Sequence, residues 1–411
     1  MVCLRTARSR LWRQPSVFRN TNVETSETVK TNNRRAPIAI GAIVVALAVA
    51  FGVWALAASP RSLKTTPIAP APPIAHAPLP VELRGVYITA LTASSYDKYV
   101  ALIASVKAKG VNAIVLDVKT EDGSLAFAPN DPALKQEAPV NDIILNPERL
   151  VKATHDAGLY LIARMPVFED PAFAEKNPKL ALRMADGSLW RNAKGLAWLD
   201  PAAEVAWKYN ADIAREVYAR GFDEVQLDYV RFATDGKTSK IVFPIYDSKK
   251  ENMRGTIGRF FAYMDKELRG EGIPISVDMF GYTTWHQSDL GIGQWYADAL
   301  SHFDFVSPMV YPSHYPAGTL GFKKAAEHPY EIVIDSLKKG NEVVAQLTAD
   351  PSHPRVGTQR PWLQAFNLGA VYTPAMILSQ VKAAREAGSV GFLFWNASNN
   401  YSSLPNLISN Q

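Results

Sequence analysis

Short apolar runs alternate with longer segments of helical periodicity from about residue 81 to the end of the chain. Three of the helical segments, 96–110, 202–221 and 374–388, end at the glycine that is typical of a helix C-terminus. The short runs predict strands at 84–90, 111–119, 158–165, 222–230, 273–280, 304–311, 360–366 and 390–396. Repeated strand-then-helix units with eight strands predict an α/β fold, a closed (β/α)8 TIM barrel.

A doubly wound open sheet is the structural alternative. Such sheets usually have fewer strands and often carry a glycine-rich first turn, whereas the first turn here, at 90–97, reads ALTASSYD. The barrel is therefore the favoured fold.

The predicted fourth strand, 222–230, has an unusual polar face. Glu224, Gln226 and Asp228 alternate with Val225, Leu227 and Tyr229. Side chains alternate across a strand, and the apolar set must face the surrounding helices. The polar set then points into the barrel, and a buried carboxylate there needs either solvent at the mouth or a partner.

Other strands place reactive residue types at the same end, where barrel enzymes carry their catalytic groups. Asp117 and Lys119 share a face with Ala113 and Val115 on the second strand, and Asp278 shares one with Ser276 on the fifth. We predict that Asp228 and Asp278 are catalytic. The predicted substrate-binding residues are Tyr87, Asp117, Lys119, Arg164, Gln226, Arg231, Tyr311, His314, Trp362, Gln364, Trp395 and Asn396.

Structural roles compete with these assignments. Asp117 with Lys119, or Asp228 with Arg231, would also make ion pairs that close the top of the barrel. Asp304 opens its strand at the opposite face and is expected to be structural. Tyr87 and Trp362 would fill the interior as readily as they would stack on a ligand.

The longest connection follows the third predicted strand and runs from 166 to 201. On a barrel it belongs to the C-terminal face, where binding loops collect. Its Trp190 and Trp198 form either a lid over the site or the core of an inserted turn.

The N-terminal part has three further segments. Residues 1–36 carry an excess of six positive charges. Since the net charge of the whole chain is +5, the net charge of the remaining residues is near −1. The remaining residues therefore give no reason to expect a nucleic-acid partner. Residues 37–58 have no charged side chain and are long enough to cross the ~30 Å hydrocarbon core of a membrane. Residues 59–80 are a linker rich in proline and alanine, and 81–411 form the barrel domain.

The basic flank of 37–58 predicts a single-pass signal-anchor with a cytoplasmic N-terminus and the barrel outside the cytoplasm. The alternative is a cleaved signal peptide, because Ala55-Leu56-Ala57 resembles a cleavage site. The apolar run is longer than a usual signal sequence, which favours the anchor. The single cysteine, Cys3, leaves the predicted exported part without a thiol nucleophile or disulfide.

Common cofactor and metal motifs are missing. The sequence contains no phosphate-binding G-x-x-x-x-G-K-[ST] loop, no H-E-x-x-H and no G-x-S-x-G elbow, and its histidines lack zinc-ligand spacing. We therefore expect neither a cofactor nor a metal. Two carboxylates at the mouth of a barrel are the parts of a glycosidase, in which one is nucleophile or base and the other protonates the leaving oxygen.

Five motifs carry a family resemblance: QLDYVRF at 226–232, ISVDMFGY at 275–282, SPMVYPSHY at 307–315, RPWLQAF at 360–366 and GFLFWN at 391–396. In this order they resemble the putative glycosyl hydrolase domain family, a bacterial group within the TIM-barrel glycosidase superfamily. The resemblance covers about 81–400 and implies the barrel and a carbohydrate substrate.

A looser similarity to α-amylase-like barrels implies that Asp228 is the nucleophile and that Asp278 occupies the position of the acid. The chain departs from that pattern in having Gln226 where the amylase type has arginine, and aspartate rather than glutamate at 278. An aspartate reaches less far, so the acid could instead be another carboxyl just beyond strands two and three. These candidates are Glu121, Asp122, Glu169 and Asp170.

The expected function is a glycoside hydrolase acting on a cell-envelope or extracellular polysaccharide by paired-carboxylate chemistry. A catalytically inactive glycan-binding barrel of the cell envelope is the alternative from another class. A carbohydrate deacetylase is disfavoured by the missing metal-ligand set.

Overall fold

The computed structural model describes residues 75–408, all within one compact unit. The predicted basic tail, the predicted membrane span at 37–58 and most of the predicted linker lie outside these residues. Within 75–408, none of the helices has both the length and the apolar character needed to cross a membrane.

The strands form one closed barrel in which every pairing is parallel. They are β1 (Leu83–Ile88), β2 (Ala113–Asp117), β3 (Tyr160–Pro166), β4 (Glu224–Asp228), β5 (Ile275–Phe280), β6 (Phe305–Met309), β7 (Thr358–Gln359), β8 (Trp362–Gln364) and β9 (Gly391–Trp395). Closure comes from the pairing of β1 with β9 and of β5 with β6. The predicted barrel and all eight predicted strand positions are confirmed.

The seventh position of the barrel is divided between β7 and β8. Pro361 lies between them and has no N–H to offer to a sheet ladder. Arg360 donates its N–H to Val306 O at 2.9 Å, and pairing resumes at Trp362. The predicted strand 360–366 therefore missed β7 and included the interruption.

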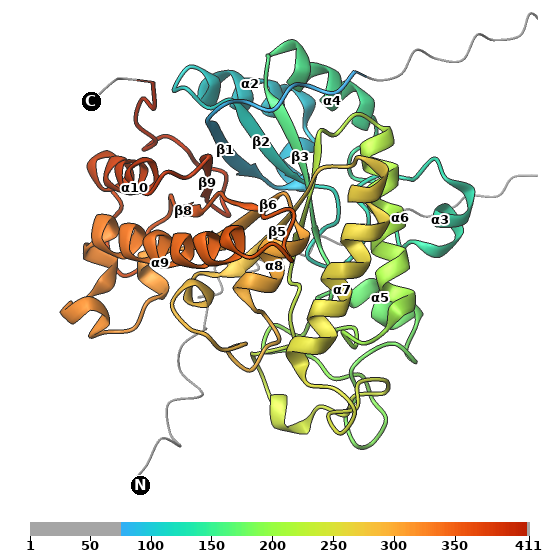
Figure 1. The fold of residues 1–411 in the computed structure, drawn as a ribbon. Coiled ribbons are helices and arrows are strands. Elements are labelled where there is room, and N and C mark those ends of the chain that lie inside the picture. Colours follow the sequence, from blue (N-terminus) through green and yellow to red (C-terminus); the bar gives the residue numbers. More distant parts are fainter. Residues whose placement is uncertain (1–74, 409–411) are drawn as a thin grey trace, which may run out of the picture. The chain divides into compact units, whose positions relative to one another are not determined.

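Helices surround the strands on the outside (Figure 1). They are α1 (Ala90–Ala93), α2 (Tyr96–Lys107), α3 (Pro132–Glu137), α4 (Pro147–Asp156), α5 (Pro171–Lys176), α6 (Glu204–Ala219), α7 (Met253–Glu267), α8 (Tyr296–His302), α9 (Pro329–Ala349) and α10 (Pro374–Glu386). Proline occupies the first turn of α3, α4, α5, α9 and α10, where its missing N–H costs nothing. No helix follows β9 as far as residue 408, so the last strand-then-helix unit lacks its helix in the part described.

The strand parity predicted from the sequence is confirmed. Val225 and Leu227 of β4 are fully buried in the outer core against the helices. The apolar side chains that fill the barrel interior form a separate cluster: Leu83, Tyr87, Ala113, Val115, Tyr160, Ile162, Tyr311, Trp362 and Leu393. The polar residues of β4 share this interior.

The lower part of the interior contains a fully buried ion pair. Both guanidinium nitrogens Nη1 and Nη2 of Arg360 donate to Glu224, one of them at 3.0 Å, and neither side chain is exposed. Ser276 donates to the same carboxylate at 2.5 Å. The charge that β4 places inside the barrel is therefore neutralised by a residue from the seventh strand position.

The insert after β3 has its own apolar core. Trp190 and Trp198 are both buried and belong to the outer core cluster. Trp190 also donates its indole N–H to Lys237 O at 3.1 Å. Of the two predicted roles, the core of an inserted turn is therefore correct and the lid is wrong.

The opposite face of the barrel has structural contacts. Asp304 lies just before β6, accepts the N–H of Ile275 at 3.0 Å and pairs with Arg269 at 3.4 Å, as expected for a structural residue. On this side the last residues of the predicted linker contact the barrel, because Ala77 donates its N–H to Asp223 at 2.7 Å.

The Glu224–Arg360 pair generates a stability prediction. Arg360→Met should lower the free energy of unfolding by about 3–5 kcal/mol, because it leaves a carboxylate unpaired in the interior. Urea denaturation measures this change. The double variant E224Q/R360M should recover most of the loss. Arg355→Met, at an arginine that is largely exposed, should change stability by no more than about 0.5 kcal/mol. Equal losses in R360M and R355M would contradict the assignment.

Candidate active site

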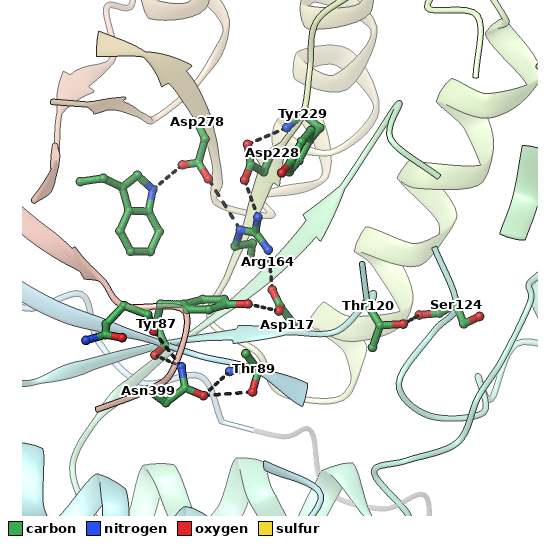
Figure 2. A network of polar contacts seen from close by, with 12 residues as sticks. Tyr87, Thr89, Asp117, Thr120, Ser124, Arg164, Asp228, Tyr229, Asp278 and Asn399 are labelled. Carbon is green, nitrogen blue, oxygen red and sulfur yellow. Dashed lines mark hydrogen bonds and ion pairs between the residues drawn. The ribbon is translucent and has the colours of Figure 1, made fainter. Parts of the chain in front are cut away.

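Arg164, on β3, lies at the centre of a cluster of carboxylates in the upper part of the barrel (Figure 2). Its Nη1 donates to Asp117 at 2.6 Å and its Nη2 donates to Asp228 at 2.5 Å. Its Nε lies 4.0 Å from Asp278. One guanidinium therefore contacts acidic residues from three different strands, β2, β4 and β5.

Asp228 ends β4 next to an unusual backbone conformation. Tyr229, directly after it, has a φ of 54°, in the left-handed region that non-glycine residues rarely adopt. In this conformation the Tyr229 N–H donates to the Asp228 carboxylate at 2.6 Å. Backbone strain of this kind often occurs at functional sites, where surrounding contacts maintain it.

Asp278 is more deeply enclosed than the other two acids. Only 1% of its surface is exposed, against 7% for Asp117 and for Asp228. Trp362 donates its indole N–H to Asp278 at 2.7 Å. Burial, and then the charge of Asp228, raise the pKa of the Asp278 carboxyl well above its ordinary value. Asp278 is therefore expected to hold its proton beside Asp228.

Asp117 is fixed from both sides. The Tyr87 hydroxyl and Arg164 both donate to its carboxylate. Burial raises the pKa of Asp117, although Arg164 and the Tyr87 hydroxyl oppose this rise. Burial disfavours the charge of Arg164 itself, but Asp117 and Asp228 outweigh that effect and raise its pKa above the usual range.

The cluster has more acid than base. Three carboxyl groups surround the one guanidinium, so an excess of negative charge is left even when Asp278 is protonated. Such a site favours a substrate or transition state in which positive charge develops. Two buried polar atoms here, Arg164 Nε and Gln226 Oε1, have no hydrogen-bond partner.

Aromatic rings line the site. Tyr87 and Trp395 are stacked at 4.0 Å, and Trp395 meets Trp362 edge-on at 5.6 Å. The Arg164 guanidinium lies 5.0 Å from the Trp395 ring centre. Burial, and then the charges of Asp278 and Asp228, raise the pKa of Tyr311, which places this ring near the same acids. Of the predicted site residues, the structure thus brings together Asp228, Asp278, Tyr87, Asp117, Arg164, Tyr311, Trp362 and Trp395.

Three other predicted substrate-binding residues have structural contacts instead. Lys119 is fully buried, with its amine 2.6 Å from Asp170 and 3.1 Å from Asn210 of α6. The Gln364 side chain accepts from Ser313 N and donates to Phe366 O. The polar atoms of both side chains are therefore already bonded within the protein.

The third residue, Asn396, also makes its hydrogen bonds within the protein. Its amide donates to Ala365 O and Asn400 O, and its oxygen accepts from Ser398. It therefore fixes the loop after β9. Short polar side chains after a strand often stabilise such turns.

Gln226, Arg231 and His314 lie around the cluster. Gln226 is fully buried and donates to Ser307 at 3.3 Å. Arg231 packs its guanidinium about equally on Trp198 and Phe280, at 4.9 and 5.0 Å from the ring centres. Burial lowers the pKa of His314 to about 4, so the ring is neutral at physiological pH.

The two ion pairs considered from the sequence, Asp117 with Lys119 and Asp228 with Arg231, are wrong. Arg164 is the cationic partner of both acids. Lys119 instead pairs with Asp170, at the N-terminus of α5, and donates to Asn210 of α6.

The four additional acid candidates have different environments. Glu121 and Asp122 are exposed, and Asp170 is buried against Lys119. Glu169 is 4% exposed and accepts a hydrogen bond from Asn192 at 2.9 Å. Burial raises the pKa of Glu169 to about 7, against the opposing charges of Arg231 and Lys194.

One feature of the candidate site could not be predicted from the sequence. Tyr229 was assigned only to the apolar face of β4, and its left-handed backbone was not expected. The sequence offered no glycine or asparagine there to indicate it. Within 75–408 no group of three or more His, Cys, Asp or Glu residues is arranged to hold a metal ion.

Two of the solved structures that resemble this chain differ in the extent of their similarity to it. The PgaB (BpsB) glycoside hydrolase domain from Bordetella bronchiseptica is 14% identical, with 78% of this chain and 95% of that chain covered and a TM-score of 0.55. A hypothetical protein from Ruminiclostridium thermocellum is 28% identical over 50% of this chain and 98% of that chain, with a TM-score of 0.43. Only the first likeness is close enough to carry an argument, and it supports the fold alone.

A search of curated proteins found no match. The model of the family described as "Putative glycosyl hydrolase domain" matches residues 85–401, which span the barrel from β1 to the segment after β9. This match confirms the resemblance inferred from the five sequence motifs. The chain belongs to the putative glycosyl hydrolase domain family.

Proposed function

We propose that the protein is a glycoside hydrolase that cleaves a cell-envelope or extracellular polysaccharide. The observation that carries this proposal is the placement of Asp228 near Asp278, whose pKa is raised by burial and by the charge of Asp228, with Arg164 between the two acids. Paired carboxyl groups in different protonation states are the chemical requirement for glycosidic bond cleavage. The family match supports the same reaction class.

Asp228 is the proposed carboxylate that acts at the anomeric carbon. Arg164 and the Tyr229 N–H both donate to it, and these are donors that an ionised carboxylate accepts well. Both also fix its orientation, because Arg164 is tied to Asp117 at the same time. A positioned anion stabilises the positive charge that develops on the sugar ring in the transition state.

The surrounding rings provide the proposed sugar-binding surface. Trp395 is partly exposed and stacks on Tyr87, which itself donates to Asp117. A flat aromatic ring can contact the apolar face of a sugar while the carboxylates meet its polar edge. The proposal also retains the location expected from the sequence, with the barrel outside the cytoplasm and joined to a membrane anchor at 37–58.

Replacing Asp228 tests the proposal directly. Asp228→Asn should lower kcat/KM by at least about 10³-fold, because the amide cannot form or stabilise the glycosyl intermediate. The measurement is reducing-sugar release from a panel of polysaccharides and aryl glycosides. Asp156→Asn, at an exposed acid on α4, is the matched control and should keep wild-type activity.

The same variant separates the enzyme from a glycan-binding barrel. An enzyme loses turnover in D228N while the affinity for the glycan changes little. A wild-type protein that binds a glycan but releases no sugar, together with a D228N variant that binds equally well, would support the binding protein and contradict the hydrolase.

Arg164→Lys tests the central cation. Lysine is a point charge that cannot span Asp117 and Asp228 as the planar guanidinium does, so kcat/KM should fall about 10²-fold or more. The matched control is Arg191→Lys, at a partly exposed arginine paired with Glu175, which should retain activity. Thermal unfolding of both variants shows whether the barrel is intact. Full activity in a folded R164K would rule out a need for the bridge.

A further inference from the structure

We infer that Glu169, on the connection after β3, is the residue that passes a proton to the leaving oxygen, in place of Asp278. This inference rests on the proposed hydrolase function and identifies a further catalytic residue for it. The sequence left both acids open, and their surroundings in the structure distinguish them.

Asp278 is poorly placed to reach a leaving group. It is 1% exposed, and one of its oxygens already accepts from the Trp362 indole. Phe280, two residues further along β5, points to the same face of the strand and is itself buried. Asp278 therefore lies beneath a layer of side chains, where a proton is retained but not delivered.

Glu169 lies on the C-terminal side of the barrel, beside the strand that carries Asp228. The chain leaves β3 at Pro166, and Val167 still donates its N–H to Asp228 O at 2.9 Å. Glu169 follows two residues later. The segment that carries Glu169 is thus hydrogen-bonded to the backbone of Asp228.

Only one oxygen of Glu169 is held by the protein. Asn192 donates to Oε2 at 2.9 Å, and Asn192 is fixed in turn because its own oxygen accepts the N–H groups of Lys194 and Leu196. Oε1 has no hydrogen-bond partner within the described chain. A general acid needs a carboxyl that is held through one oxygen while the other oxygen is free to hydrogen-bond the substrate, and Glu169 has this arrangement.

Tyr229 connects Glu169 to Asp228. Burial, then the charges of Glu169 and of Asp228, raise the pKa of the Tyr229 hydroxyl, so this side chain lies within the field of both acids. Arg231 packs over the Tyr229 ring at 5.3 Å and opposes the rise in the pKa of Glu169. The acids therefore flank one residue at the top of the barrel.

The protonation state of Glu169 suits the role. Its pKa of about 7 leaves a large protonated fraction at neutral pH, and the proton is still easily transferred. As the glycosidic C–O bond breaks, its electron pair stays on the leaving oxygen, which takes the Glu169 proton. Asp228 stabilises the glycosyl group until water adds its oxygen to the anomeric carbon and returns a proton to Glu169.

Glu169→Gln in the full-length protein tests the assignment through the leaving group. The probes are phenyl and 2,4-dinitrophenyl glycosides of a sugar that the wild type cleaves. On the phenyl glycoside, kcat/KM should fall about 10²–10⁴-fold, because this leaving group needs a proton. On the dinitrophenyl glycoside the loss should be less than about 10-fold, because dinitrophenolate leaves without one.

The pH profile gives a second readout. Wild-type kcat/KM should decline above pH about 7, as Glu169 loses its proton, and E169Q should lack this decline. Glu175→Gln is the matched control, since Glu175 is exposed and pairs with Arg191 of the same insert. It should keep both the rate and the profile.

A ¹³C NMR titration of labelled glutamate carboxyls checks the group without an activity assay. The resonance that disappears in E169Q identifies Glu169. If it titrates near pH 7 in the wild type the inference is supported, and if it titrates below pH 5 the inference is overturned. Equal losses on both glycosides in E169Q would also overturn it, as would a leaving-group-dependent loss in D278N instead. If D228N keeps full turnover, the proposed function itself fails, whatever E169Q does.

Discussion

The arrangement of the upper barrel depends on one guanidinium. Strand alternation places Asp117, Asp228 and Asp278 in the interior, where unpaired carboxylates would be strongly unfavourable. Arg164 reaches all three because a planar fork with five donors can contact several acceptors at once. Burial, and then the charge of Asp228, raise the pKa of Asp278 against the opposing charge of Arg164. The same guanidinium orients the Asp228 carboxylate, so the contacts that make the interior stable also position the acids.

The interior contains a second polar layer, and the comparison between the two is informative. Glu224 and Arg360 form a balanced pair in which neither side chain is exposed and Ser276 completes the contacts of the carboxylate. A balanced, dry pair is a structural solution to burying charge. Around Arg164, acids outnumber the cation and Tyr229, next to Asp228, has a strained backbone. Buried polar atoms without partners occur in both layers: Arg164 Nε and Gln226 Oε1 above, and Arg360 Nε below. The difference between the layers is therefore one of charge balance, and the unbalanced upper layer is the one to which the proposed function is assigned.

Much of this could be predicted from the sequence because it depends on periodicity. The alternation of strand and helix predicted the barrel, and the alternation along β4 predicted which side chains of Glu224, Gln226 and Asp228 point inward. Ion-pair partners could not be predicted in the same way. Sequence neighbours such as Lys119 were paired with Asp117, but Lys119 lies past the end of β2 and turns towards α6. Arg164 reaches Asp117 because the two are register partners across β2 and β3, a relation that only the pairing of the strands defines.

Glu169 illustrates the limit of strand-based reasoning about chemistry. A strand side chain that points into a narrow barrel is surrounded on every side, as Asp278 is, and burial together with the charge of Asp228 raises its pKa. A residue on the connection after a strand has freedom to approach a ligand from above, but it needs an external partner to orient it. Asn192, from the distant part of the same insert, supplies that partner. The insert after β3 therefore does more than fill space around Trp190 and Trp198, because its folded core also fixes Asn192, which orients the Glu169 carboxyl.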